Sequence, residues 1–255
     1  MARGQRDARD PAIERAHFDA LVTAKGVLYW ADRTPAGRRR QAIRAEALAT
    51  RTGAAADDRI LEIGCGTGEY SRRLAGLTPA TLVSVDVAPA AAAQAHRATG
   101  SAACVAAADV ERLPFAAATF AAVLGNAVLH HLRLDRALPE LMRVLRPGGR
   151  FCFAEPNLLN PHVFVEKKVP WVARRLDDSP GETAFTRWGL RRDLEAAGLV
   201  EITIRPFDFL YPLVPGALVP AVERIGRVLE RAPLVREIAG SLLISARKDS
   251  GPAGR

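Results

Sequence analysis

Three glycines at alternating positions, Gly64, Gly66 and Gly68, directly follow a short apolar run. Because glycine carries no side chain, a turn built from it lets the backbone approach a ligand closely. The run before them, from Arg59, is typical of a buried parallel strand, and residues 70–75 can open a helix whose N-terminal amides face that ligand. This pattern indicates a site for a nucleotide-like cofactor.

Two acidic residues follow the glycines at expected strand ends. Asp86 comes roughly 20 residues after Gly64, the offset at which a carboxylate can accept hydrogen bonds from a ribose diol. Asp109 follows the next apolar run and can receive the exocyclic amine of an adenine ring, beside the backbone and apolar edge of Val110. A helix cap at Asp86 and a loop turn at Asp109 are the alternatives. The spacing favours contacts with a nucleoside.

Groups that could move a proton lie farther along the chain. His130 and His131 follow a fourth apolar run, and Glu155 ends a fifth. A histidine can deprotonate a hydroxyl near neutral pH, and Glu155 could contact an acceptor or the cofactor. The histidine pair could equally cap or pack at the start of the helix after it. These three residues are therefore candidates, and the sequence assigns no catalytic base.

Alternating apolar runs and helical patterns must position these residues. Strands are predicted at Arg59–Ile63, Thr81–Asp86, Ala102–Ala107, Phe120–Gly125, Arg150–Glu155, Val200–Phe207 and Ser241–Arg247. Helices are predicted at His17–Gly26, Arg38–Thr50, Gly68–Ala75, Pro89–Ala98, Asp135–Leu145, after a cap at Thr186, and at Ala221–Arg231. Strand and helix alternating over short connections predict an α/β fold, a doubly wound parallel sheet with helices on both faces.

No internal repeat or dividing linker interrupts the 255 residues, so one domain is expected. Within it, residues 1–57 would form an N-terminal helical cap, 58–157 the cofactor-binding core, and 158–255 the acceptor-side insertions with the remaining helix and strands. Tyr29 and Trp30 could line the site or pack a helix on the sheet. The division places acceptor choice outside the core.

Composition limits the class of protein. Apolar residues make up 49% and charged residues 25%, as in ordinary globular proteins, and no run is long enough to span a membrane. Residues 1–11 lack the apolar core of a signal peptide, so a cytoplasmic location is expected. The three cysteines are far apart and not in metal-ligand spacing, so no metal site is expected. The net charge of +8 could attract an anionic partner or reflect codon composition.

Four segments together resemble the class I S-adenosylmethionine-dependent methyltransferases, and most closely the subgroup acting on quinones and small molecules. These segments are LEIGCGTGEY (61–70), VDVAP (85–89), ADVERLPF (108–115) and the block from residue 123 to 157 containing HHL and LRPGG. A nicotinamide-dependent dehydrogenase would explain the first segment but not the last two. The resemblance covers roughly residues 58–157, in the family's order.

The resemblance implies a Rossmann-like seven-stranded sheet whose last strand is antiparallel, with S-adenosyl-L-methionine as cofactor. It also implies the cofactor contacts. These are Glu62, Gly64 and Gly66 around the methionine part, Asp86 at the ribose, Asp109 and Val110 at the adenine, and Asn126 at the methionyl end. The chain lacks the Asn/Asp-Pro-Pro-aromatic tetrad of methyltransferases that act on exocyclic amines of DNA or on protein glutamine.

The acceptor predicted from these features is a small or lipophilic molecule, methylated at oxygen. An apolar, proline-broken segment at 207–222 beside a basic, tryptophan-bearing stretch at 163–176 fits such an acceptor or peripheral membrane contact, and equally a dimer contact or an insertion core. A tRNA or rRNA methyltransferase is the alternative motivated by the arginine runs, although nucleic acid is disfavoured because no RNA-binding module is present. A non-catalytic cofactor-binding regulatory subunit is a further alternative. The oligomeric state is not predicted.

Overall fold

The computed structural model describes residues 10–26, 34–169, 171, 179 and 182–251. Tyr29 and Trp30, predicted to line the site or pack a helix, lie outside the described residues, as does most of 170–178. No helix in the described ranges is long and apolar enough to cross a bilayer.

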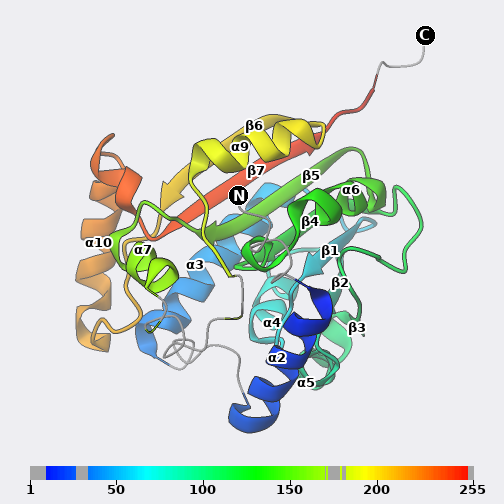
Figure 1. The fold of residues 1–255 in the computed structure, drawn as a ribbon, viewed down its shortest axis with the longest axis horizontal. Helices are drawn as coiled ribbons and strands as arrows, with labels where there is room; N and C mark the ends of the chain where they lie inside the picture. Colours follow the sequence, from blue (N-terminus) through cyan, green and yellow to red (C-terminus); the bar gives the residue numbers. More distant parts are fainter. Residues whose placement is uncertain (1–9, 27–33, 170, 172–178, 180–181, 252–255) are drawn as a thin grey trace.

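A seven-stranded sheet in the order β3-β2-β1-β4-β5-β7-β6 forms the centre of the molecule (Figure 1). Its strands are β1 (Arg59–Ile63), β2 (Thr81–Asp86), β3 (Cys104–Ala107), β4 (Phe120–Asn126), β5 (Leu145–Pro156), β6 (Leu199–Phe207) and β7 (Ser241–Lys248). Strands β1 to β5 pair in parallel, whereas β7 runs antiparallel to both β5 and β6. The predicted fold class and the antiparallel last strand are confirmed.

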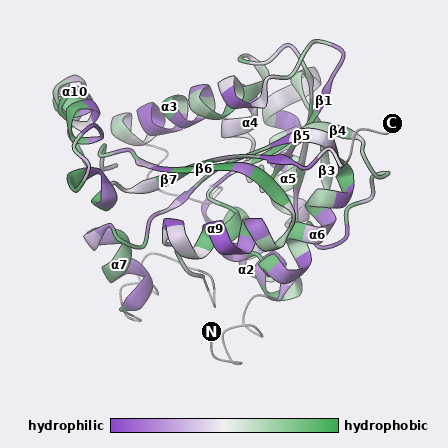
Figure 2. Cartoon of the chain, turned by 90° about the horizontal axis from the view of Figure 1, so that it is seen from above, coloured by the Kyte–Doolittle hydropathy of each residue, from purple (hydrophilic) through white to green (hydrophobic). Residues whose placement is uncertain are grey.

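Helices cover both faces of this sheet, as the view from above makes plain (Figure 2). The helices are α2 (Pro11–Lys25), α3 (Pro35–Thr52), α4 (Glu69–Ala75), α5 (Pro89–Thr99), α6 (Leu134–Val144), α7 (Pro161–Lys168), α9 (Arg187–Ala196) and α10 (Val219–Leu229). One core cluster packs α6 and α9 against one face, and a second packs α3 and α4 against the other. Burial of apolar side chains on both faces explains why the central strands are almost continuously apolar.

Local capping chemistry sets where the N-terminal helices begin. Asp10 accepts a hydrogen bond from the Ala12 amide, and Thr34 accepts one from the Gly37 amide. Each cap is followed by a proline at the first helical position, where the missing N–H costs nothing. Helices α2 and α3 therefore start several residues before the predicted His17 and Arg38.

Two strand starts and one additional helix also differ from the prediction. Strand β3 starts at Cys104, because the preceding residues 100–102 form a short 3-10 turn. Strand β5 starts at Leu145, which pairs with Phe120 ahead of a register shift, so the LRPGG block belongs to the strand. Helix α7, capped by Asn160, occupies part of the stretch after β5 for which no element is predicted from the sequence.

Candidate functional site

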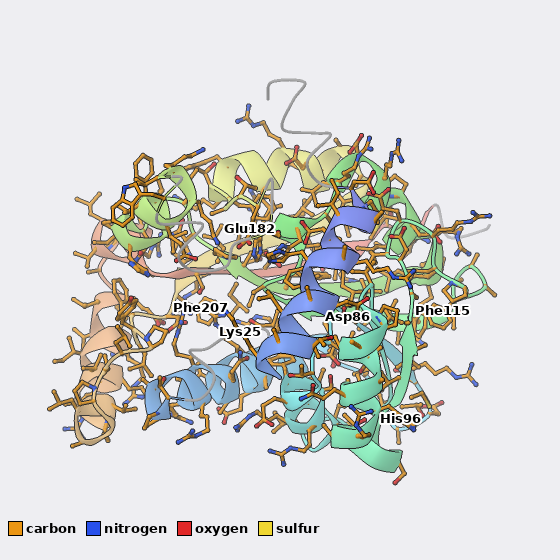
Figure 3. The ribbon with its side chains drawn as sticks, turned by 60° about the horizontal axis from the view of Figure 1, so that its bottom comes forward. Lys25, Asp86, His96, Phe115, Glu182 and Phe207 are labelled. Atoms are coloured by element: carbon orange, nitrogen blue, oxygen red, sulfur yellow. The ribbon has the colours of Figure 1, made fainter. Side chains whose placement is uncertain are left out.

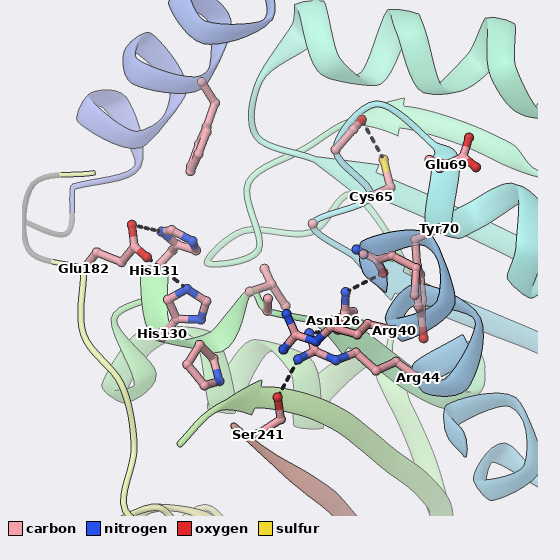
Figure 4. Close-up of a pocket in the computed structure, with 18 of the residues that line it drawn as sticks. Arg40, Arg44, Cys65, Glu69, Tyr70, Asn126, His130, His131, Glu182 and Ser241 are labelled. Atoms are coloured by element: carbon pink, nitrogen blue, oxygen red, sulfur yellow. Dashed lines mark hydrogen bonds and ion pairs between the residues drawn. The ribbon is translucent and has the colours of Figure 1, made fainter. Parts of the chain in front are cut away.

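A cavity of about 780 Å³ opens beyond the carboxyl ends of β1, β2 and β4. Pockets that hold small ligands and cofactors have volumes of about 300–1,000 Å³. The predicted contacts Gly64, Gly66, Asp86, Asp109, Val110 and Asn126 all line it, and so do His130 and His131. Two predicted site residues, Glu62 and Glu155, are not among its lining residues. Groups from distant parts of the chain therefore converge on one space (Figure 4).

The glycine loop between β1 and α4 adopts a backbone that other residues avoid. Gly64, Gly66 and Gly68 have φ angles of 66°, 54° and 86°, all left-handed. A Cβ on Gly64 would lie 2.5 Å from a methyl of Val128, and one on Gly68 would lie 2.6 Å from the Ala95 Cα. Glycine is required at these positions because other residues avoid these φ angles and because a Cβ at Gly64 or Gly68 would clash with its neighbours. The loop therefore presents backbone atoms to the cavity and forms a cradle for a ligand.

Asp86 fixes this cradle from the end of β2. One carboxylate oxygen accepts a hydrogen bond from the Gly66 amide at 2.8 Å, and the other accepts from the Ala88 amide at 2.9 Å. Burial raises the pKa of Asp86, and the two amides offset part of that rise. Since each carboxylate oxygen has a second lone pair, Asp86 can still accept hydrogen bonds from a diol in the cavity.

Glu62 lies under the loop, 1% exposed, and accepts a hydrogen bond of 2.6 Å from the Ser84 hydroxyl. Burial raises the pKa of Glu62 to about 7, with Ser84 and Ser71 opposing the rise. Glu62 is a buried residue of β1 that does not line the cavity, so its position does not support the predicted direct contact with the cofactor. Its carboxylate instead links β1 to Ser84 of β2.

The positions predicted to face the adenine and the methionyl end are also held by hydrogen bonds, local at Asp109 and long-range at Asn126. Asp109 accepts from the Glu111 amide at 2.8 Å, which closes the turn after β3. Asn126, at the end of β4, accepts from Arg44 at 3.2 Å and donates to Gln41 at 3.1 Å. Helix α3 is therefore tied to the cavity through Asn126.

The loop after β4 is strained and anchored by one carboxylate. Ala127 has a φ of 55°, a conformation that costs a residue with a Cβ about 1–2 kcal/mol. Glu155 accepts hydrogen bonds from the amides of Val128, Leu129 and His130 and pairs with the His130 ring at 2.7 Å. Glu155 therefore orients the loop rather than facing an acceptor, a correction to its predicted contact role.

The structure also argues against His130 as a base. Its Nδ1 is 2.7 Å from Glu155 and its Nε2 is 3.3 Å from Glu182. Burial alone would lower the pKa of His130, but hydrogen bonds and the charges of Glu155 and Glu182 outweigh it and raise the pKa to about 9. An imidazole already protonated at neutral pH cannot accept a proton there.

His131 takes part in a second set of contacts that the sequence does not suggest. Its Nδ1 lies 3.1 Å from the Ser179 hydroxyl, 3.4 Å from Glu14 and 3.9 Å from Glu182. Burial would raise the pKa of Glu182, but His131, His130 and Lys167 outweigh it and hold that pKa well below its usual value. Figure 4 shows Glu182, His131 and His130 gathered at one side of the cavity.

Glu14 reaches this cluster because α2 is docked on the core at its other end. Phe18 and Val22 pack against Ala88 and Ala91, and Asp19 accepts from the Ala90 amide at 2.9 Å. A single carboxylate on an amphipathic helix gives no signal of its partner in the sequence, so Glu14 could not be predicted.

A second missed group covers the opposite side of the cavity. Arg40 and Arg44 of α3 both bind one oxygen of Asp208, at 2.8 and 3.0 Å. Arg44 also donates to the Ser241 hydroxyl at 2.5 Å. The Tyr70 hydroxyl is buried at the cavity with no hydrogen-bond partner among the described residues. The arginine run from Arg38, which motivates the RNA alternative, is thus partly engaged in internal ion pairs.

Comparisons with known proteins agree with this architecture. Residues 61–153 match the family described as a methyltransferase domain. The chain is 35% identical over 179 residues to malonyl-[acyl-carrier protein] O-methyltransferase of Geobacter sulfurreducens, which covers 66% of each chain. It is 34% identical over 122 residues to demethylmenaquinone methyltransferase of Thermobifida fusca, covering 41% of this chain and 52% of that protein.

Solved structures share the fold at lower identity. An S-adenosylmethionine-dependent methyltransferase from Mesorhizobium loti superimposes with a TM-score of 0.58 at 20% identity, covering 86% of this chain and all of that one. A geranyl diphosphate methyltransferase gives a TM-score of 0.58 at 19% identity, covering 83% and 86%. The chain spans 36–66% of the length of the first four curated relatives it matches. By its domain match, relatives and fold, the chain belongs to the class I S-adenosylmethionine-dependent methyltransferases.

Proposed function

We propose that this protein transfers a methyl group from S-adenosylmethionine to an oxygen of a small or lipophilic acceptor. One observation carries the proposal. Six residues predicted from the sequence to contact that cofactor line one cavity, with the left-handed glycine loop at its floor. When bound, the cofactor supplies an electrophilic methyl group on a sulfonium. In-line transfer then depends mainly on orientation and exclusion of water.

In this proposal, the chain's own residues bind and orient the donor. Asp86 accepts the ribose hydroxyls while its two backbone hydrogen bonds keep the carboxylate fixed. Asp109 and Val110 hold the adenine, and Asn126 faces the methionyl end. Residues 58–157 serve the cofactor, whereas residues 1–57 and 158–255 serve the acceptor. That division keeps the domain organisation predicted from the sequence.

The acceptor side of the cavity combines cations with apolar surface. Arg40 and Arg44 lie near one wall, and Leu210, Tyr211 and Pro212 line the cavity beside them. Relatives are named for malonyl-[acyl-carrier protein] and for demethylmenaquinone, one an anionic acyl group and the other a lipophilic quinone. The arginines of this wall suit an anionic acyl group, and its apolar residues suit a lipophilic quinone. The proposal includes peripheral contact with a membrane, because Leu213 and Leu218 are exposed.

The proton balance depends on the acceptor. A carboxylate acceptor has no proton to lose, so no base is needed. A hydroxyl acceptor would require one, and among the two histidine candidates only His131 remains, because both ring nitrogens of His130 face carboxylates. Transfer to a carboxylate therefore needs no catalytic base, whereas transfer to a hydroxyl would depend on His131.

The first experiment is calorimetric titration with S-adenosylmethionine and S-adenosylhomocysteine, with NADH as the control. We expect micromolar binding of both sulfur ligands and none of NADH. Labelled-methyl transfer would then be screened with malonyl-[acyl-carrier protein], a demethylated quinol and bulk RNA. Failure of both sulfur ligands to bind would overturn the proposal. Cofactor binding without transfer would favour the regulatory-subunit alternative, and transfer to RNA alone would favour the RNA methyltransferase.

A further inference from the structure

Four side chains that the cofactor does not require converge at the edge of the cavity beside α2. His130 and His131 follow β4, Glu182 precedes α9, and Glu14 comes from α2. One ligating atom from each of His130, His131 and Glu182 lies within 4.8 Å of the others. Figure 3 shows Glu182 beside α2, with Asp86 on the other side of that helix. None of the four is among the residues predicted to contact the cofactor.

We propose that His130, His131, Glu182 and Glu14 bind a divalent first-row transition-metal ion. Bonds of such ions to nitrogen and oxygen are about 2.0–2.2 Å long, so ligands around one ion lie about 3–4.3 Å apart. His130 Nε2 is 3.3 Å from Glu182, and His131 Nδ1 is 3.9 Å from Glu182 and 3.4 Å from Glu14. These separations suit a common ion after small side-chain movements.

A second observation points to a missing cation. Glu14 is 4% exposed, and its Oε1 accepts a hydrogen bond of 2.8 Å from the Ser179 hydroxyl. Its Oε2 has no hydrogen-bond partner among the described residues and lies 3.4 Å from His131 Nδ1. A buried carboxylate oxygen left in this way costs free energy unless a cation or donor joins it. A metal ion between Glu14 and His131 would provide the partner.

The charge of the cluster agrees. Metal binding displaces the protons from the imidazoles. Among the described residues, the carboxylates of Glu14, Glu155 and Glu182, together with Glu166, then face the ammonium of Lys167, which pairs with Glu182 and Glu166. This excess of negative charge favours a divalent cation. In the metal-free protein Lys167 and the protonated His130 ring both pair with Glu182, so each competes with the metal for that carboxylate.

Glu155 is the carboxylate partner that a metal-binding histidine usually has on its second ring nitrogen. A ligating imidazole normally gives its other N–H to a carboxylate, which sets the tautomer and the ring orientation. Glu155 binds His130 Nδ1 at 2.7 Å and leaves Nε2 facing Glu182. Two imidazoles with carboxylates suit Zn²⁺, Fe²⁺ or Co²⁺ better than Mg²⁺ or Ca²⁺.

The site faces the cavity, because all four ligands line it. An ion bound by these four ligands would keep a position open to a bound molecule at a coordination number of five or six, and there it would hold an oxyanion such as a carboxylate of the acceptor. That use of the ion rests on the proposed function, whereas the binding of the ion does not.

The test is titration of untagged, chelator-treated protein with Co²⁺, read by visible absorption, and with Zn²⁺ by calorimetry. A Cys104→Ser background removes the exposed thiol as an adventitious ligand. We expect one equivalent of Co²⁺ per chain with absorption typical of nitrogen and oxygen ligands. His131→Ala should weaken binding about 100-fold and the conservative Glu14→Gln about tenfold. Lys167→Met should strengthen it several-fold.

His96→Ala is the matched control, since His96 is exposed on α5 and lies away from Glu182 (Figure 3). It should bind Co²⁺ like the parent protein. No stoichiometric binding, or equal binding by the His131→Ala and His96→Ala variants, would overturn the metal site. Titration of the parent protein with S-adenosylhomocysteine separates the two proposals, because a protein that binds it but not Co²⁺ keeps the proposed function and loses only the metal.

Discussion

The two halves of the cavity are built differently. On the side predicted to bind the cofactor, the glycine loop follows β1, Asp86 ends β2 and Asp109 lies just beyond β3, and both carboxylates accept hydrogen bonds from backbone amides. On the side proposed to bind the acceptor, Glu14, His131 and Glu182 come from three segments far apart in the chain. The first half depends on backbone conformation and the second on long-range ion pairs. Substitutions in the two halves should therefore affect stability and ligand binding differently.

The largest expected effect is on stability, from Glu155→Ala. Removing this carboxylate leaves three amides and the buried His130 without their acceptor, and breaking a buried pair from one side costs about 3–5 kcal/mol. Denaturant unfolding should show that loss. Glu201→Ala is the control, because the Glu201 side chain is 58% exposed. A loss below about 1 kcal/mol, the size of one ordinary hydrogen bond, would mean that Glu155 does not hold the loop.

Asp86→Ala should act on the cofactor half. We expect the affinity for S-adenosylhomocysteine to fall by about 1.5–3 kcal/mol, roughly 10- to 150-fold, through loss of hydrogen bonds to a charged group. Calorimetry measures it, with the exposed Asp57→Ala as control. Unchanged affinity in a folded Asp86→Ala variant would remove Asp86 from the site and break the distinction between the halves.

The pH dependence of stability in the Glu62→Gln variant tests the role of Glu62 below the glycine loop. Burial raises the pKa of Glu62 in the folded protein to about 7, so folding favours the protonated form. The stability this confers is present below the unfolded pKa near 4.5 and is lost as pH rises through 7. At pH 8 the Gln variant should be more stable than the parent by on the order of 1–3 kcal/mol, and at pH 4.5 nearly equal. A difference independent of pH would contradict this assignment.

The smallest effect is expected far from the cavity. Arg146 pairs with Asp58 at 2.6 Å, but the Arg146 side chain is 50% exposed. Arg146→Ala should therefore cost less than about 1 kcal/mol in denaturant unfolding and leave cofactor affinity unchanged. A change in cofactor affinity would show that the geometry of the cavity depends on contacts at distant parts of the sheet.

The sequence by itself determined the cofactor half. Glycines that need left-handed φ angles, an acidic residue at the end of β2 and apolar runs of strand length are local requirements, so a single stretch of chain records them. The helix starts are also encoded locally, since a Thr or Asp cap followed by a proline is a local signal. The starts of α2 and α3 nevertheless lie several residues before those predicted from the sequence.

Only the tertiary structure decided the acceptor half. The roles of Glu14, Glu182 and Arg44 depend on partners more than 40 residues away, and a charged side chain looks the same in the sequence whether it meets solvent or a buried partner. Likewise Glu155, a candidate for contact with an acceptor or the cofactor, is buried and accepts hydrogen bonds from the amides that follow Ala127. Contacts of this kind depend on how α2, α3 and the segment before α9 pack over the sheet, and no local pattern specifies that packing.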